Sequence, residues 1–205
     1  MSRIHQAAVA ALLLLLFVPA ASAADYRVIE DSATPGDPDS IQVTEFFWYG
    51  CPHCYRFAPE IDQWREAKPA DVSFRHVPAI LSERWALHAR AFYAAKVLGV
   101  LDEFHRPMFR AIHEQGKAMR SKAEIGEFVA SLGLDAEAFT GAMDSLGVDT
   151  RLKRARDLQS AYGVSGTPSV VIDGRYITSG SMAGSFERML QVIDERVAAA
   201  RGDRG

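Results

Sequence analysis

A predicted strand runs directly into a predicted helix, and the only two cysteines of the chain lie at the junction. Residues 41–49 are rich in β-branched and aromatic side chains, which predicts a buried strand. Residues 52–68 carry apolar side chains at helical spacing and begin with Pro52, a residue favoured in the first helical turn. A helix should therefore start there, with Cys51 as its N-cap. A second strand, 72–77, follows, so the chain opens with a β-α-β unit that favours an α/β fold.

Residues 80–162 have a different pattern, because apolar residues recur there at spacings of three and four and glycines interrupt them. The pattern predicts an inserted all-helical subdomain with helices at 86–98, 101–112, 122–132, 136–146 and 150–162. The remaining elements are an edge strand at 26–29, a hairpin of strands 169–172 and 175–178, and a last helix at 185–200. We expect a mixed central sheet flanked by helices, with the helical subdomain inserted into it.

The N-terminus looks like a secretory signal peptide. Arg3 supplies a positive charge, residues 7–18 are an unbroken apolar run, and Ala21-Ser22-Ala23 has the small-x-small pattern of a cleavage site. A membrane anchor is the alternative, but the apolar run is well short of the ~20 residues that span a bilayer. We therefore expect a cleaved signal at 1–23, and a mature chain with a first domain part at 24–79, the insertion at 80–162 and a second part at 163–205.

The charge and the cysteine content limit the classes of function that the chain can have. The formal net charge is -3, and without a basic excess a nucleic-acid partner has no electrostatic support. Export would place Cys51 and Cys54 where thiols are readily oxidised. A zinc site would need two more ligands, and no second C-x-x-C or H-x-x-x-H follows, so no metal is expected. A purely structural disulfide across four residues would stabilise little, which leaves redox catalysis as the preferred reading.

The sequence Cys51-Pro52-His53-Cys54 suits such catalysis. At a helix N-terminus, unpaired backbone N–H groups and the helix dipole favour the thiolate of Cys51, which is both the attacking species and the better leaving group. His53 can add positive charge or a hydrogen bond, Pro52 keeps the turn rigid, and Cys54 would be the buried resolving partner.

A second motif, Gly163-Val164-Ser165-Gly166-Thr167-Pro168, precedes the short apolar strand. Proline is acceptable only at the first residue of a strand or at an edge, which places Pro168 at the strand start. From the local sequence, the bond before Pro168 can be cis or that of an ordinary trans turn proline.

Together, Glu45-Phe46-Phe47-Trp48-Tyr49-Gly50-Cys51-Pro52-His53-Cys54-Tyr55 and the 163–168 motif resemble the bacterial DsbA family of thioredoxin-fold oxidases. The resemblance implies a thioredoxin fold, Cys51 as the exposed nucleophile, Cys54 as its buried disulfide partner, and Thr167-Pro168 as a cis-proline loop packed against the disulfide. It also matches Glu45 to an acidic residue near the buried cysteine. Glu45 is then either a proton acceptor for Cys54 or a strand-end carboxylate paired with a base.

The resemblance implies a periplasmic enzyme that donates its disulfide to reduced, folding exported proteins. No cofactor is needed, a membrane protein of the DsbB type would reoxidise it, and we expect a monomer. One alternative is a periplasmic reductase or isomerase, because Thr167 stands where oxidases of the family often have valine and isomerase-like relatives often have threonine. Another is a chaperone-like binding module with an inert disulfide.

Overall fold

A five-stranded mixed sheet forms the centre of the protein, with strand order β1-β5-β4-β2-β3. The computed structural model describes residues 24–30 and 39–203, so the expected signal peptide at 1–23 lies outside the described residues. The strands are β1 (Arg27–Val28), β2 (Ile41–Phe47), β3 (Val72–Pro78), β4 (Ser169–Ile172) and β5 (Tyr176–Ser179). Only β2 and β3 pair in parallel, and the other neighbours are antiparallel. This confirms the predicted mixed sheet.

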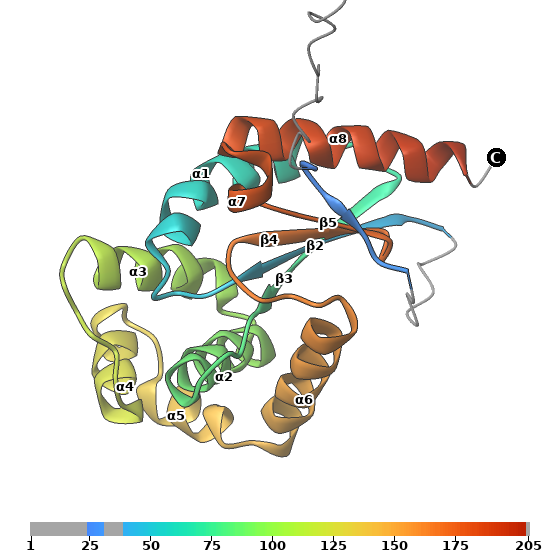
Figure 1. Ribbon diagram of the computed structural model, residues 1–205. Helices are drawn as coiled ribbons and strands as arrows, with labels where there is room; N and C mark the ends of the chain where they lie inside the picture. The colour runs from blue at the N-terminus through green and yellow to red at the C-terminus, as the bar shows by residue number, and fades with distance from the viewer. Residues whose placement is uncertain (1–23, 31–38, 204–205) are drawn as a thin grey trace, which may run out of the picture.

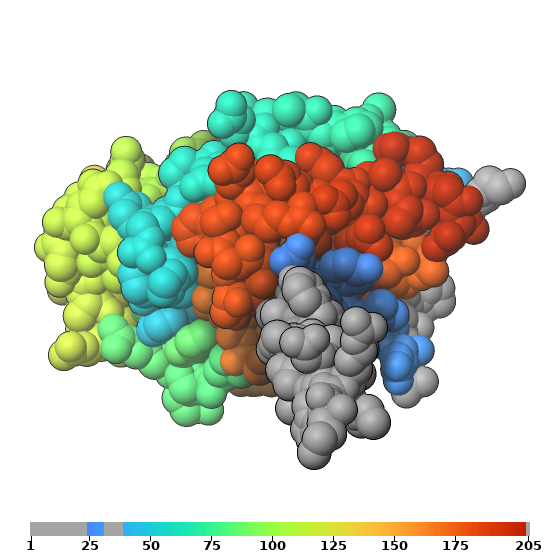
Figure 2. Space-filling model, turned by 45° about the horizontal axis from the view of Figure 1, so that its top comes forward, coloured from blue at the N-terminus to red at the C-terminus, as the bar shows by residue number. Residues whose placement is uncertain are grey.

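The helices lie in two groups around the sheet (Figure 1). One group consists of α1 (Pro52–Ala67), α7 (Gly180–Ala183) and α8 (Phe186–Gly202). The other follows β3 without an intervening strand and consists of α2 (Glu83–Leu98), α3 (Leu101–His113), α4 (Lys122–Ser131), α5 (Ala136–Met143) and α6 (Leu146–Ala161). In the space-filling view α8 and α1 lie side by side, and parts of the second group of helices, in yellow-green and green, lie at the left and along the bottom (Figure 2). Among the described residues no helix is long and apolar enough to cross a membrane.

Strand β2 positions the cysteines because it lies between β3 and β4 and is buried along almost its whole length. Alternate side chains point to opposite faces of a strand. Val43 packs with α1 and α8 in one hydrophobic cluster, whereas Phe46, from the other face, belongs to the larger cluster that includes the insertion helices. The carboxyl end of β2 thus leads to Cys51 where the two helical groups meet.

Several boundaries differ from the sequence prediction, and helix α5, which was predicted to reach residue 146, ends at Met143. Helix α6 begins at Leu146 rather than at 150, because Ser145 caps it by accepting a hydrogen bond from the Val148 amide at 3.3 Å. Gly147 therefore lies in a first helical turn and does not separate two helices. Helix α7 was not predicted, since its four residues are too few to show helical periodicity.

Candidate active site

The Cys51 sulfur lies at the N-terminus of α1. Cys51 has extended backbone angles and caps the helix, with its sulfur 3.4 Å from the Cys54 amide nitrogen. The pKa of Cys51 is lowered from 9.0 to about 5, mainly by a hydrogen bond with the Cys54 side chain. Burial opposes this shift, while the Thr167 side chain and the amides of Cys54 and His53 add to it. The thiolate of Cys51 is therefore the dominant form at neutral pH.

The Cys54 sulfur differs from that of Cys51, because its pKa is raised rather than lowered. Cys54 is fully buried, one helical turn after Cys51, and the two are free thiols in this structure. Burial raises the pKa of the Cys54 thiol well above its ordinary value, and the nearby Cys51 sulfur and the Glu45 carboxylate raise it further. One sulfur of the pair is thus an anion at neutral pH while the other keeps its proton.

The loop before β4 contacts the first sulfur. The Thr167-Pro168 bond is cis, and the Cys51 thiol can donate to the Thr167 main-chain oxygen at 3.3 Å. Pro168 comes immediately before β4, and the Ser169 hydroxyl closes the loop by donating to the Gly166 oxygen at 2.8 Å. Two predicted motifs that are far apart in the sequence therefore meet at one sulfur.

Pro52 and His53 lie in the first turn of α1, as the sequence predicted. The His53 imidazole, however, is oriented differently from the prediction. Pro52 is the first residue of α1, and the His53 amide acts on the Cys51 sulfur. The exposed His53 ring instead has its Nδ1 atom 2.9 Å from the Arg56 guanidinium. In this structure His53 acts on the sulfur through its main chain, while its ring faces solvent.

Glu45 is paired with a base that the sequence analysis did not identify. Its carboxylate lies 2.7 Å from His76 Nδ1, and only 2% of Glu45 is exposed. His76 Nε2 is buried without a hydrogen-bond partner and lies 3.9 Å from the Asp62 carboxylate, whose other oxygen pairs with Arg106 at 3.0 Å. The parallel register pairs Ile41 with Val72, and counting along both strands from there places Glu45 opposite His76. Aligning the starts of the two predicted strands would have revealed this pair.

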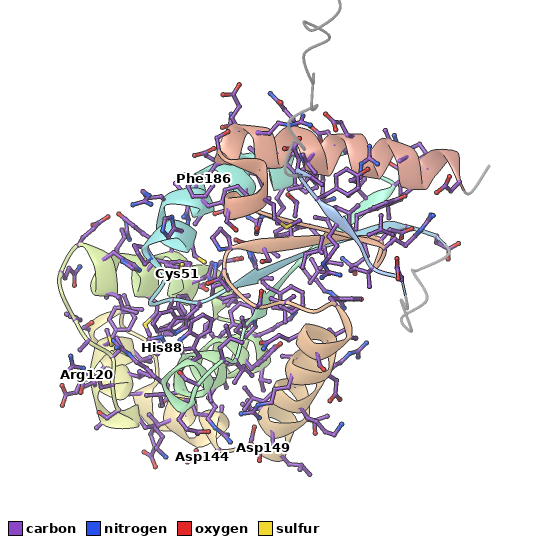
Figure 3. The ribbon with its side chains drawn as sticks, viewed as in Figure 1. Cys51, His88, Arg120, Asp144, Asp149 and Phe186 are labelled. Carbon is purple, nitrogen blue, oxygen red and sulfur yellow. The ribbon has the colours of Figure 1, made fainter. Side chains whose placement is uncertain are left out.

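A groove of about 650 Å³ runs along the Thr167-Pro168 loop, whose main chain contacts the Cys51 sulfur, and neither cysteine lines it. His53 and the Thr167-Pro168 loop line it near the sulfur, and Met182 and Phe186 line it further away. Figure 3 shows Cys51 between the insertion helices and the segment that carries Phe186. The groove combines main-chain groups with a few apolar side chains, which suits an extended peptide with little sequence preference. Within the part of the chain that is described, no three His, Cys, Asp or Glu side chains are grouped to hold a metal ion.

Known proteins are similar to this chain in sequence and in fold. Residues 65–191 match the DSBA-like thioredoxin domain family. The thiol:disulfide interchange protein DsbA of Azotobacter vinelandii is 41% identical over 164 residues, which cover 80% of this chain and 77% of that protein. The protein of the same name from Pseudomonas aeruginosa is 36% identical over 197 residues, with 91% and 93% covered.

Solved structures of proteins with the same name also superimpose on this chain. The crystal structure of Pseudomonas aeruginosa DsbA superimposes with a TM-score of 0.84 at 34% identity, covering 88% of this chain and 94% of that one. The oxidoreductase DsbA from Xylella fastidiosa gives a TM-score of 0.80 at 34% identity, with 87% and 96% covered. The resemblance therefore extends over the sheet and both groups of helices.

Proposed function

The chain belongs to the DsbA family of thiol:disulfide oxidoreductases, and from this premise we propose that Cys51 and Cys54 form the disulfide it donates to substrate proteins with free thiols. The observation that carries the assignment is the contrast between the two sulfurs. The pKa of Cys51 is about 5, whereas burial holds that of Cys54 well above its ordinary value. An acidic thiol is a good leaving group, so a mixed disulfide through Cys51 is readily released.

The reaction then proceeds in two exchanges. A substrate thiolate attacks the Cys51 sulfur, forming a mixed disulfide and releasing Cys54 as the leaving group. A second substrate thiolate attacks the substrate sulfur of that mixed disulfide, and Cys51 leaves as a thiolate. The substrate gains one disulfide and the enzyme becomes a dithiol, so two electrons pass from the substrate to the enzyme.

Glu45 and His76 are proposed to exchange the proton of Cys54. A buried thiol with a raised pKa must gain a proton when it leaves and lose it when the enzyme is reoxidised. Glu45 acts on the charge of Cys54 and is bonded to His76, which faces Asp62. Because Asp62 is 19% exposed while Glu45 and His76 are nearly enclosed, this row of groups leads from the buried sulfur towards solvent.

Substrate segments are proposed to bind in the groove beside the Thr167-Pro168 loop. The main chain of that loop can pair with an extended polypeptide next to the Cys51 sulfur, with Met182 and Phe186 as apolar contacts. Main-chain pairing makes recognition independent of most side chains, as an enzyme with many substrates requires.

The cellular setting follows from the same proposal. The signal-like N-terminus supports export to the periplasm, where reduced, folding proteins are the substrates. After each turnover the dithiol must be reoxidised, and we propose a membrane partner of the DsbB type for that step. The enzyme would need no cofactor, because its own sulfurs carry both electrons. We propose that it acts as a monomer.

Single-cysteine variants test the assignment of the two sulfurs. Cys54→Ser should accumulate a mixed disulfide with a peptide supplied as an activated disulfide, because the Cys51 thiolate displaces the activating thiol and no Cys54 remains to displace the bound peptide, whereas Cys51→Ser should trap none. Both variants should lose peptide oxidation. Mass spectrometry of the trapped species identifies the linked sulfur, and trapping through Cys54 in Cys51→Ser would overturn the assignment.

A further inference from the structure

The groove along the Thr167-Pro168 loop contains one guanidinium group, that of Arg27 on the edge strand β1. Among the described residues that line the groove, Arg27 is the only arginine or lysine, and none is an aspartate or a glutamate. The whole chain, by contrast, has a formal net charge of -3. The groove therefore carries a positive charge on an acidic protein, and the two exchange steps make no use of that charge.

Strand pairing and one hydrogen bond hold the Arg27 side chain against the start of the 163–168 loop. Strand β1 pairs antiparallel with β5, which places Arg27 opposite Ile177, another residue of the groove. The Arg27 Nη2 atom donates to the Tyr162 main-chain oxygen at 2.9 Å. A Cβ atom at Gly163 would lie 3.0 Å from the same nitrogen, so a glycine at this position lets the guanidinium approach the loop closely.

Most of the hydrogen-bonding capacity of this guanidinium is unused. Its main-chain bond takes one of five N–H groups. In the described ranges 24–30 and 39–203, no carboxylate lies within 4 Å of Arg27, whereas Arg175, beside β5, pairs with Asp203 at 2.7 Å. A carboxylate entering the groove fits the remaining donors, because a guanidinium presents parallel N–H groups to two oxygens.

The length of the loop limits how far the acidic side chain of a substrate can be from its cysteine. At the other end of the loop, the Thr167 main-chain oxygen lies 3.3 Å from the Cys51 sulfur. The four residue steps from Gly163 to Thr167 span at most about 14 Å in an extended chain. A substrate segment extended along the loop covers that length with the same number of residues, so an acidic residue within about four positions of its cysteine can reach Arg27.

We propose that Arg27 selects substrate segments that carry an aspartate or a glutamate within about four residues of the reacting cysteine. This inference rests on the proposed function, since it names the substrate class of the same groove. Arg27 acts on the bound segment and not on the sulfurs, which makes it a specificity-determining residue. Because a segment lies in the groove in one direction, an acidic residue on only one side of the cysteine reaches the guanidinium.

A series of single-cysteine peptides tests the proposal. Each peptide has one glutamate two, three or four residues before or after its cysteine, and each has a counterpart with glutamine there. The measured quantity is the second-order rate constant for reduction of the oxidised protein, followed by acid quenching and mass spectrometry. Rates with hydroxyethyl disulfide, which is uncharged, correct for the effect of the glutamate on the peptide thiol itself.

After this correction, wild type should prefer glutamate to glutamine by about fivefold at one or more positions on one side of the cysteine, as expected for a partly exposed ion pair. The preference should fall in about 1 M salt, where charges are screened within ~3 Å. Arg27→Gln should lose the preference and should react with the glutamine peptides as wild type does.

The matched control is Arg120→Gln, which removes the same charge from an exposed position just before α4, on the part of the molecule away from Phe186 in Figure 3. It should keep the full preference, and an equal loss in both variants would show attraction to net charge only and overturn the proposal. Equal rates for glutamate and glutamine peptides in wild type would also overturn it, as would a preference that Arg27→Gln retains. In these cases the peptides are still oxidised and the proposed function stands, whereas failure of every peptide to reduce wild type would overturn both.

Discussion

The Cys51 sulfur lies 3.3 Å from the main-chain oxygen of Thr167, although 116 residues separate them in the sequence. Thr167 also has a hydroxyl that acts on the same sulfur and lowers the pKa of Cys51. The loop before β4 therefore borders the groove that we propose to bind peptides and also helps to set the charge of the Cys51 sulfur.

Replacing Thr167 with valine should raise the pKa of Cys51. Valine keeps the shape of the side chain but removes the hydroxyl that stabilises the thiolate. We expect the thiolate absorbance of the reduced variant to titrate at a pH above that of wild type, which is about 5. Thr167→Ser is the control, because it keeps the hydroxyl and should titrate close to wild type. If valine left the midpoint unchanged, the hydroxyl would have no part in stabilising the thiolate.

Glu45→Gln should slow the steps in which Cys54 gains or loses a proton. Proton transfer by a positioned group typically contributes about 10²–10⁴-fold, so we expect the attack of Cys54 on a preformed mixed disulfide to slow by at least about tenfold near neutral pH. His76→Gln should slow the same step and change its pH profile, because the base bonded to Glu45 is then lost.

Stopped-flow release of a fluorescent peptide from the Cys51 mixed disulfide measures that step. Glu66→Gln, at an exposed position near the end of α1, is the control and should match wild type. Wild-type rates and pH profiles in both Glu45→Gln and His76→Gln would assign the pair a structural role only.

The reduced protein should become more stable, relative to its Cys51→Ser variant, as pH rises from 5 to 8. The folded-state pKa of Cys51, about 5, lies below the ordinary 9.0, so its contribution is complete above pH 9 and is lost as pH falls to 5. The slope should be about 1.4 kcal/mol per pH unit. The raised pKa of Cys54 has the opposite effect, but only where the unfolded thiol ionises, near pH 9.

Urea unfolding under reducing conditions at several pH values measures this difference. Serine is a suitable reference because it is also a good N-cap residue. A stability difference that did not vary between pH 5 and 8 would contradict a stabilised Cys51 thiolate.

Local patterns were enough to predict the strand–helix junction that places Cys51 at an N-cap. The junction depends on residues close together in the sequence, a β-branched and aromatic run followed by Pro52 and a helical repeat. Helix α6 shows the limit of such reasoning. A glycine such as Gly147 predicts a break between helices, but the Ser145 cap places Gly147 inside the first turn of α6.

Relationships across the sheet were harder to predict. His76 has no distinctive neighbours in the sequence, and its pairing with Glu45 depends on the register of β2 and β3. Such a pairing depends on which strands lie side by side and in what register, and local composition does not specify this.

Titration of the thiolate absorbance of the reduced protein against pH tests the central claim most directly, with Cys51→Ser as the reference for the contribution of Cys54. The account predicts a transition near pH 5 that is absent in Cys51→Ser, because the helix N-terminus, the Cys54 thiol and the Thr167 hydroxyl all favour the anion. A transition near the ordinary thiol value of 9.0 would show that the sulfur is not held as an anion, and would contradict the proposed role of Cys51.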